Sequence, residues 1–530
     1  MKKGLLGISL ITLSGLYILL SAIIILVSIL LDFPVIYGIG ISIIIIIIQF
    51  LISPFLTDLT MKWFYKAKFK YEIPEYLKSF IDSVCQENKM KYPKIGFIDD
   101  GAPNAFTYGH TKNDARIILT RGIFELLTEE EVKAVVAHEL GHALHYDMIF
   151  MTVAELVPLI LYGIYEICNK ADKNNNNNSN DYIELIGMIA YVIYLISNYI
   201  VLWLSRTREY YADAYSVEAT KNPNALASAL VKVGYGLTTA ETNKKHSAAR
   251  SNALGIFDSK TSKALAVTST EDGSIDKENI KQAMKWEQWN IWAKWYELHS
   301  THPLISKRLL KISSRSKEFN QEPFIIFDLN KEESYLNDFL LELLINFLPI
   351  ISFIISVIIL IISLDTVTKP FMFIGIAILI CLFFSYIKFK RRYRSSHFKE
   401  ATVRDLLSET KVSHITSIPC SLEGTIIGRG NPGCIFNEDF VIKDESGIIF
   451  LDYNQPVHFV NKIFALFKSK EYFDKKVKVT GWYRRSPVPY VELKTIEIDG
   501  KIKKVYTYKF TIFFYIVSLI VAIVLILLGL

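Results

Sequence analysis

Cysteine is scarce in this sequence. The 530 residues include five cysteines, and no two of them form a Cys-x-x-Cys pair. Closely spaced cysteine pairs are the usual sign of a zinc site held by sulfur, and recurrent cysteines in a short chain indicate a disulfide framework. The sequence therefore argues against a disulfide-stabilised fold and against a metal ion held by thiolates.

Charge is absent from two long stretches near the N-terminus, residues 4–31 and 35–56. Each is near the length of about 20 apolar residues that a helix needs to cross a bilayer. The first run is too long for a secretory signal, and a second follows it directly, so we interpret it as a retained anchor. Further apolar stretches cover residues 149–168, 183–204, 343–364, 370–387 and 510–530. We expect a multi-pass protein of the cell membrane, with the lipid bilayer as a partner.

One of these stretches is open to a second interpretation. Residues 149–168 are interrupted by Glu155 and Glu166, so this segment could instead be a buried core helix. The asparagine-rich segment Asn174–Asn178 then separates it from the next stretch and is typical of a flexible turn.

The net charge is only +6, but the placement of the basic residues is informative. Lysine and arginine beside a span tend to stay in the cytoplasm. One alternating topology keeps all of these basic loops inside the cell. It places residues 62–148, 205–342 and 388–507 in the cytoplasm, and the last span ends outside. The basic run after residue 387 then fixes topology, and we expect no nucleic-acid partner. The residues that decide this are Lys2, Lys3, Lys62, Lys66, Lys68, Lys70, Arg206, Arg208, Lys388, Lys390, Arg391, Arg392 and Arg394.

Residues 128–146 are predicted to form one helix. Thr128 and Glu131 have the spacing of a capping box at its start. Apolar side chains recur behind them at helical spacing, namely Val132, Val135, Val136 and Leu140. Short strands are expected before this helix, at residues 95–98 and 116–120, where turn residues flank apolar runs.

This helix contains the motif His138-Glu139-Leu140-Gly141-His142. Positions i and i+4 of a helix share one face, so both imidazoles can bind the same zinc ion. Glu139 lies about 100° around the helix and can reach a water on that ion, which is the geometry of a general base. A chance pair of histidines is the alternative, but the capped helical context argues against it.

A peptidase zinc site needs a third protein ligand. His145 lies on the same face as His138 but about 10 Å along the helix, too far to share the ion, so we assign it to outer support or packing. Glu209 is the best candidate, because a helical hairpin returns it to the same membrane face. Asp213, one turn further, could hydrogen-bond a histidine ligand. Without the histidine motif, we would interpret this Glu-x-x-x-Asp pair as part of an ordinary solvent-exposed helix face.

Four segments carry a family resemblance: Pro103–Phe106, Ala137–His142 with Asp147, Ser205–Asp213, and Ser300–Pro303 with Arg308. In this order they resemble the membrane-bound HtpX-type zinc metallopeptidases, relatives of the CAAX prenyl proteases. The resemblance covers about residues 1–312.

The resemblance implies one zinc ion held by His138, His142 and Glu209, with Asp213 beside a ligand. It implies that Asn104, Ala105 and Phe106 form an edge strand that pairs with substrate backbone. His302 would lie near the site and stabilise the oxyanion; its alternative is a structural turn before a helix. The expected substrates are proteins or peptides, above all membrane proteins.

Residues 420–500 have an all-β pattern, with strand-like runs at 422–428, 439–443, 447–452, 476–483 and 489–498. A helix-like segment, 457–467, lies between the third and fourth runs, which is the order of an OB-type barrel. Four tryptophans at positions 286, 289, 292 and 295 could form an interfacial belt, but core packing is the interpretation we favour.

The predicted fold class is an α-helical multi-pass membrane protein with a zincin-like α+β metallopeptidase domain and a C-terminal, mostly-β, OB-like domain. The predicted domains are 1–61 (two spans), 62–342 (metallopeptidase, with a membrane hairpin at 149–204), 343–387 (two spans), 388–507 (cytoplasmic β-rich domain) and 508–530 (final span).

The leading hypothesis is a membrane zinc endopeptidase in membrane-protein quality control. One alternative is a CAAX-type processing peptidase. The other, from a different class, is a non-catalytic scaffold that displays the β domain, although a scaffold has no use for the base Glu139.

Overall fold

The structure of the chain is a computed structural model, which describes residues 2–30, 35–63, 65–69, 71–99, 103–174, 181–239, 277–327, 334–363, 370–394, 397–429, 438–467, 469–486 and 488–529. Residues 175–180 of the asparagine-rich segment and Cys434 lie outside the described residues. The four described cysteines are free thiols, in line with the absence of a disulfide pattern. The chain forms two compact units, described in turn below: residues 1–259 with 297–326, and residues 260–296 with 327–530.

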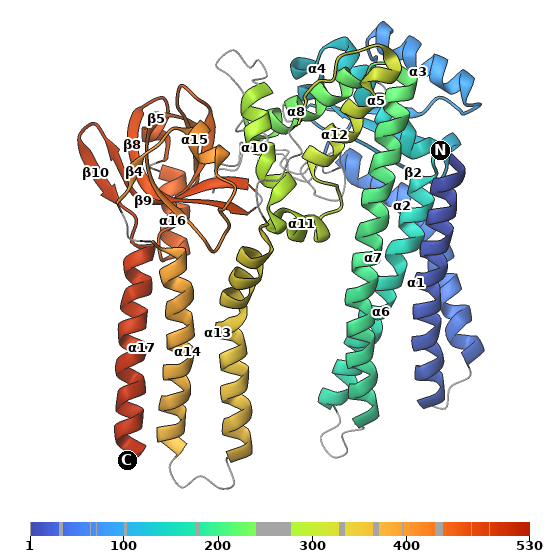
Figure 1. The fold of residues 1–530 in the computed structure, drawn as a ribbon. Coiled ribbons are helices and arrows are strands. Elements are labelled where there is room, and N and C mark those ends of the chain that lie inside the picture. The colour runs from blue at the N-terminus through green and yellow to red at the C-terminus, as the bar shows by residue number, and fades with distance from the viewer. Residues whose placement is uncertain are drawn as a thin grey trace. The chain divides into compact units, whose positions relative to one another are not determined.

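Long apolar helices dominate both units (Figure 1). Among the described residues, six helices are long and apolar enough to cross a membrane: α1 (Lys2–Leu30), α6 (Asp147–Asn174) and α7 (Asp181–Thr220) in the first unit, and α13 (Leu336–Ser363), α14 (Pro370–Arg392) and α17 (Thr507–Gly529) in the second. The uncharged stretch at 35–56 also forms a helix, α2 (Val35–Trp63), but many of its side chains lie outside the described residues. The chain is therefore a multi-pass membrane protein.

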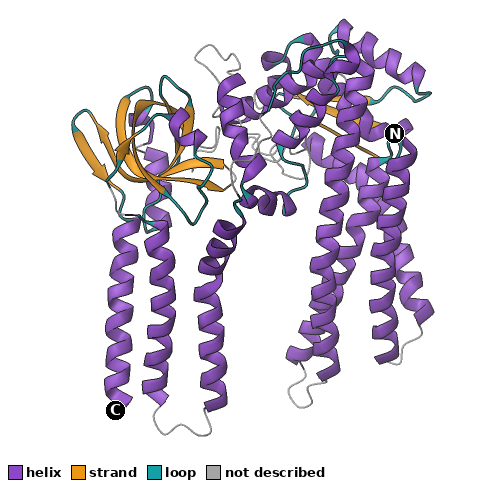
Figure 2. Cartoon of the chain, viewed as in Figure 1, coloured by secondary structure: helices purple, strands orange, loops and turns teal. Residues whose placement is uncertain are grey.

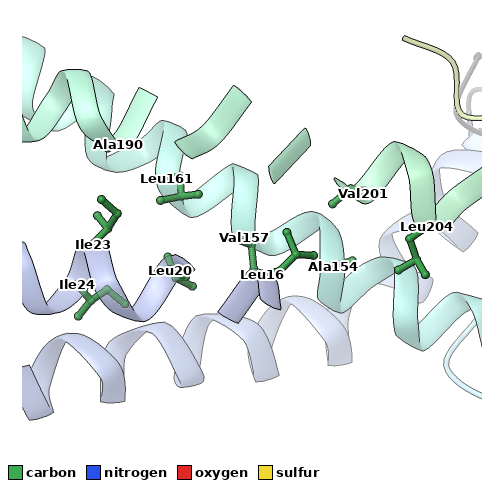
Figure 3. Close-up of a cluster of buried hydrophobic side chains, with 10 residues drawn as sticks. All are labelled: Leu16, Leu20, Ile23, Ile24, Ala154, Val157, Leu161, Ala190, Val201 and Leu204. Carbon is green, nitrogen blue, oxygen red and sulfur yellow. The ribbon is translucent and has the colours of Figure 1, made fainter. Parts of the chain in front are cut away.

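The membrane helices of the first unit pack through one apolar cluster (Figure 3). Leu16, Leu20 and Ile23 of α1 meet Ala154 and Val157 of α6 within this buried cluster. A lipid environment offers no hydrophobic drive for helices to associate, so close packing through small residues such as Ala154 has to hold them together. This cluster fixes α6 and α7, which continue directly into the soluble part of the unit.

The soluble part of the first unit combines a three-stranded sheet with helices (Figure 2). The strands β1 (Lys94–Ile98), β3 (Ala115–Thr120) and β2 (Ala105–Gly109) lie in that order, with β1 parallel and β2 antiparallel to β3. The predicted strands 95–98 and 116–120 are confirmed. Within the described residues β2 pairs only with β3, so it is an edge strand.

Helices complete this part of the unit. They are α3 (Glu75–Glu87), α4 (Arg121–Leu126), α5 (Glu129–Leu144), α8 (Pro223–Thr239) and α12 (Ile305–Ser314), with the 3₁₀ turns η1 (Lys112–Asp114) and η3 (Ser316–Phe319). Nearly every side chain of α5 is buried, because α3, α7, α8 and β2 all pack on it. The core of the unit therefore lies around the helix that carries the histidine motif.

The second unit contains a small barrel. The strands β5 (Ile418–Arg429), β6 (Phe440–Lys443), β7 (Ile448–Asp452), β9 (Val488–Ile498) and β8 (Lys476–Ser486) pair in that order, and β8 pairs back with β5 to close the circuit. The helix α16 (His458–Phe467) lies between β7 and β8 in the chain. The five strand-like runs and the helix-like segment expected from the sequence are thus confirmed as elements.

Further elements extend this unit: β4 (Lys399–Glu400), β10 (Lys501–Lys504), α10 (Lys277–Trp289), α15 (Val403–Ser408) and the turn η4 (Ser469–Tyr472), while α11 (Ile291–Leu298) crosses the boundary between the units. Trp286, Trp289 and Trp292 are buried, and the Trp286 indole donates a hydrogen bond to the carbonyl of Val412. The core-packing interpretation of these three tryptophans is correct, because the indoles are needed to fill the interior.

Candidate metal centre

The helix α5 is fixed at both ends. Thr128 and Glu131 form the predicted capping box, in which the Thr128 hydroxyl accepts from the Glu131 amide and the Glu131 carboxylate accepts from the Thr128 amide. At the other end, Tyr146 adopts a left-handed conformation with φ of 60°, and α6 begins at the next residue. This sharp joint turns the chain so that Asp147 faces back toward the histidine motif.

Three side chains converge on one point beside α5. His138 Nε2 lies 3.1 Å from His142 Nε2, and Glu209 of α7 places Oε1 3.4 Å from His142 Nε2 and Oε2 3.6 Å from His138 Nε2. One ligand atom from each residue lies within 4.8 Å of the others, and no other group of three or more such residues does so in the described part of the chain. The structure brings together the three residues that the sequence nominates as ligands.

The donor set of this cluster fits a zinc ion. Atoms about 2.0–2.2 Å from a tetrahedral ion lie about 3.4 Å from one another, close to the separations seen here. Glu209 Oε2 is buried and accepts no hydrogen bond, although groups of this kind are normally satisfied. Two imidazoles and a carboxylate with an open fourth position are the donor set of a catalytic zinc site.

A buried ion pair supports His138 from behind. His138 Nδ1 lies 3.0 Å from Asp213 Oδ1, and Asp213 accepts hydrogen bonds from Arg308 Nε at 2.9 Å and Arg308 Nη2 at 2.6 Å. The Arg308 guanidinium also approaches Glu209 Oε2 to 3.3 Å. The Arg308 guanidinium and the His138 ring both lie against this carboxylate and favour its charged form. Asp213 therefore stays ionised and can orient the His138 ring.

A second chain of contacts supports His142. His142 Nδ1 lies 2.6 Å from Asp147 Oδ2, and Arg208 Nε donates to Asp147 Oδ1 at 2.6 Å. Arg208 also donates to the carbonyl of His145 and to the hydroxyl of Ser9 in α1. Burial would lower the pKa of His142, but Asp147 and Glu209 raise it to about 9. The first transmembrane helix is thus linked through buried hydrogen bonds to the histidine motif.

Glu139 lies beside the cluster, with its side chain directed to β2. Its Oε2 accepts a hydrogen bond of 2.8 Å from the Thr107 hydroxyl, and Glu139 is 2 % exposed. Burial raises the pKa of Glu139 to about 7, although His142 and the Thr107 hydrogen bond oppose the rise. A carboxylate with a pKa near neutrality is suited to take up and release a proton.

The cluster opens into a cavity of about 190 Å³. His302 reaches it from the segment before α12, with Nε2 3.7 Å from Glu209 Oε1 and Nδ1 hydrogen-bonded to the Thr301 hydroxyl at 2.9 Å. Phe106 lines the cavity, whereas Asn104 and Ala105 do not. The cavity is lined by Phe106, Thr107, Glu139, His142, Asp147, Met148, Met151, Glu155, Ser205, Arg208, Glu209, Thr301 and His302.

His145 takes no part in the cluster. It caps the C-terminus of α5, and its ring contacts the rings of Tyr211 and Tyr215, with centroids 6.3 and 6.0 Å away. Its backbone carbonyl, rather than its ring, accepts from Arg208 at 2.8 Å. This agrees with the packing role expected from the helix geometry.

Sequence reasoning missed the supporting roles of Thr107, Arg208 and Arg308. Thr107 follows the Asn104–Phe106 segment directly, so extending the expected edge strand by one residue would have found it. Arg208 and Arg308 occur in the quoted motifs, but nothing local indicates that each holds a carboxylate. Their partners are 61 and 95 residues away in the chain, so only the fold reveals the pairs.

Comparison with known proteins decides the family. Residues 74–316 match peptidase family M48. This range contains the metal cluster and both supporting ion pairs, Arg208 with Asp147 and Arg308 with Asp213. A protease HtpX homologue from Methanothermobacter thermautotrophicus is 38 % identical over 200 residues, which are 38 % of this chain and 74 % of that protein. The chain belongs to peptidase family M48. It is therefore a membrane protein of a metallopeptidase family.

Two further proteins are similar to this chain at lower identity. A protease HtpX homologue from Aeropyrum pernix is 26 % identical over 271 residues, covering 50 % of this chain and 81 % of that protein. Among solved structures, Ste24p of S. mikatae is 18 % identical and covers 56 % of this chain and 62 % of its own, with a TM-score of 0.34.

Proposed function

We propose that this M48 peptidase is a zinc-dependent endopeptidase. The observation that carries the proposal is the convergence of His138, His142 and Glu209 on one point, with the buried Glu139 carboxylate beside them. One zinc ion bound by these three residues would act as a Lewis acid and lower the pKa of a water molecule. We assign the catalytic base to Glu139 and the metal ligands to the other three.

The chain's own groups account for the proton transfers. The Thr107 hydroxyl holds Oε2 of Glu139, so Oε1 is the oxygen left to accept a proton from the attacking water. A pKa of about 7 lets Glu139 give that proton to the departing amine afterwards. His302, whose Nε2 lies 3.7 Å from Glu209 Oε1, is proposed to donate a hydrogen bond to the oxygen that becomes negative in the transition state.

Substrate is proposed to bind as an added strand. The edge strand β2 contacts α5, and Phe106 and Thr107 line the cavity, so an extended peptide paired with β2 would lie across the cluster. Backbone pairing is indifferent to sequence, which suits an enzyme for many protein substrates. We propose membrane proteins as those substrates and their quality control as the role. A CAAX-type processing role would require prenylated substrates.

The finer fold assignments belong to the same proposal. We interpret β1–β3 and α5 as a zincin-like α+β core, and the closed barrel β5–β9 with α16 as an OB-like domain. The distribution of basic residues supports an active site in the cytoplasm of the cell. Cysteine labelling tests this orientation: reagent that cannot cross membranes should fail to label a cysteine placed at the exposed Glu130 in intact cells, and labelling there would reverse the topology.

The test of the activity is Glu139→Gln in the purified, detergent-solubilised chain. We expect the variant to bind zinc as the wild type does and to lose casein cleavage, because the ligands remain and the base is gone. Glu130→Gln is the matched control, since Glu130 is exposed on the same helix and its one ion pair within the described residues is with Lys133. Wild-type casein turnover by Glu139→Gln would refute the mechanism. Cleavage of prenylated peptides but not of casein would favour the processing role.

A further inference from the structure

A fourth carboxylate lies in the active-site cavity, outside the metal cluster. Glu155 lines the cavity together with Met148 and Met151, all of them on α6. Asp147, Met151 and Glu155 are spaced by four residues, so they share one face of that helix. On the adjoining side of α6, Ala154 and Val157 pack into the apolar cluster with α1 and α7, and Met151 also contacts that cluster. The face with Glu155 therefore continues the cavity from the metal cluster along the membrane span.

Glu155 differs from the other acids of the cavity in having no partner. Glu139 accepts from Thr107, Asp147 from Arg208, and Glu209 lies beside Arg308. Within the described residues, Glu155 has neither a hydrogen bond nor an ion pair, and its side chain is exposed. The arginine named in the lining of this cavity, Arg208, is already engaged by Asp147 and the His145 carbonyl.

An unpaired carboxylate in a membrane span is expensive, and such residues usually face a cavity and take an ionic partner. Among the described residues no lysine or arginine pairs with Glu155, while the cavity is the proposed substrate site. We propose that Glu155 binds a lysine or arginine side chain of the substrate and so sets a preference for a basic residue near the cleaved bond. This inference rests on the proposed endopeptidase function.

The spacing along α6 gives the position of that residue. Glu155 is eight residues beyond Asp147, a rise of about 12 Å. An extended peptide covers about 3.3 Å per residue, so the basic side chain lies about three to four residues from the cleaved bond. Membrane proteins carry lysine and arginine at the cytoplasmic ends of their spans. The proposed substrates are therefore membrane proteins with a basic segment directly after a span. The cleaved bond lies on the side of the basic residue that faces away from the membrane.

The experiment uses the full-length, zinc-loaded chain in detergent. Peptides of one cleavable sequence carry either lysine or glutamine, placed in turn at positions two to six residues on either side of the cleaved bond. The ratio of kcat/KM for the lysine and glutamine peptides is measured for the wild type, Glu155→Gln and Glu166→Gln. Glu166 lies on the same helix but pairs with Lys170 and the Tyr162 hydroxyl outside the cavity, so it is the matched control.

We expect the wild type and Glu166→Gln to prefer lysine by about tenfold at one position, which is the effect of a hydrogen bond to a charged group. Glu155→Gln should reduce the ratio to about one, and Glu155→Lys should favour a peptide with glutamate there. Unaltered zinc content and gel-filtration behaviour exclude a folding defect.

Two results would overturn the inference. One is a lysine-to-glutamine ratio near one in the wild type at every position. The other is a loss of rate in Glu155→Gln that leaves the wild-type ratio intact, which would make the residue structural. In both cases the cleavage itself leaves the proposed endopeptidase function standing. If the wild type cleaves none of the peptides nor casein, the proposed function fails first, which separates the two outcomes.

Discussion

Each unit of the protein buries an arginine against a carboxylate, yet the two clusters differ. In the barrel, Arg484 Nε donates to Glu492 Oε2 at 2.9 Å, and Tyr393 donates to the other oxygen. In the first unit, Arg308 holds Asp213 with two hydrogen bonds, but Glu209 beside it keeps an oxygen that accepts none. Both oxygens of Glu492 accept hydrogen bonds, whereas Glu209, which lines the cavity, has one oxygen that accepts none.

This difference separates a structural ion cluster from a functional one. Burial would raise the pKa of Glu492, but Arg484 and Arg392 hold it below its usual value, so the carboxylate is an ionised and satisfied group. Glu209 Oε2 lies 3.3 Å from the Arg308 guanidinium yet accepts no hydrogen bond, and an ion shared with His138 and His142 would use this oxygen as a ligand. Buried charge alone therefore says little about function, whereas a buried and unsatisfied ligand atom says much.

The largest expected effect is a difference in zinc binding between variants of Glu209 and of Glu492. Glu209→Ala should lose both zinc and casein cleavage, because two histidines leave the ion with an incomplete protein shell. Glu492→Gln should keep both and lose stability, since breaking a buried charge pair costs about 3–5 kcal/mol. Zinc content after dialysis against a weak chelator and the unfolding midpoint Tm are measured for each variant.

His145→Ala is the control for the metal measurement, because its ring packs on tyrosines outside the cluster. It should retain zinc. If Glu209→Ala binds zinc as tightly as the wild type while His145→Ala or His302→Ala loses it, the ligand set is wrong and a histidine completes the site.

An intermediate effect is expected for Asp213→Ala. Asp213 contacts His138 and lies outside the proposed ligand set, and residues that orient a ligand typically alter metal affinity by 10–100-fold. Competition with a chromogenic chelator gives the zinc Kd, which should rise by that factor while activity returns at high zinc. Activity that zinc excess cannot restore would mean that Asp213 acts on the chemistry rather than on the affinity.

The smallest expected effect is on how the stability of the barrel depends on pH. Burial and the charges of Asp439 and Glu492 raise the pKa of Asp452 to about 8, against about 4 in an unfolded chain. A raised carboxyl pKa contributes stability at low pH that is lost as pH rises from about 4 through about 8. Asp452→Asn should therefore have a higher Tm than the wild type at pH 9 and lose this advantage at pH 4.

Tryptophan fluorescence is the appropriate probe for this comparison. Five of the seven tryptophans belong to the unit with the barrel, namely Trp286, Trp289, Trp292, Trp295 and Trp482. Glu445→Gln, on the exposed turn between β6 and β7, is a control that should show the wild-type dependence. An unaltered pH dependence of Tm in Asp452→Asn would show that another group titrates.

Local patterns predicted the elements well. The capping box of α5, the strands β1 and β3 and the order of the barrel elements all follow from spacing and turn residues within a few positions of one another. The pattern underestimated α7, which continues from the apolar stretch 183–204 to Thr220. That extension carries Glu209 and Asp213. Its polar side chains are buried against charged and hydrogen-bonding partners, so no apolar pattern in the sequence marks it as a buried helix.

The sequence alone identifies the residues that can do the chemistry, namely two histidines four positions apart on a capped helix and a glutamate between them. Its long apolar stretches also predict that the chain crosses the membrane. These properties depend on periodicity and composition, which are local. The folded chain shows which carboxylates meet those histidines and that Thr107 and Arg308 hold the acids. It also shows that Glu155 faces the cavity without a partner among the described residues. Such contacts join residues far apart in the chain, and their energy depends on burial, which no single segment of sequence specifies.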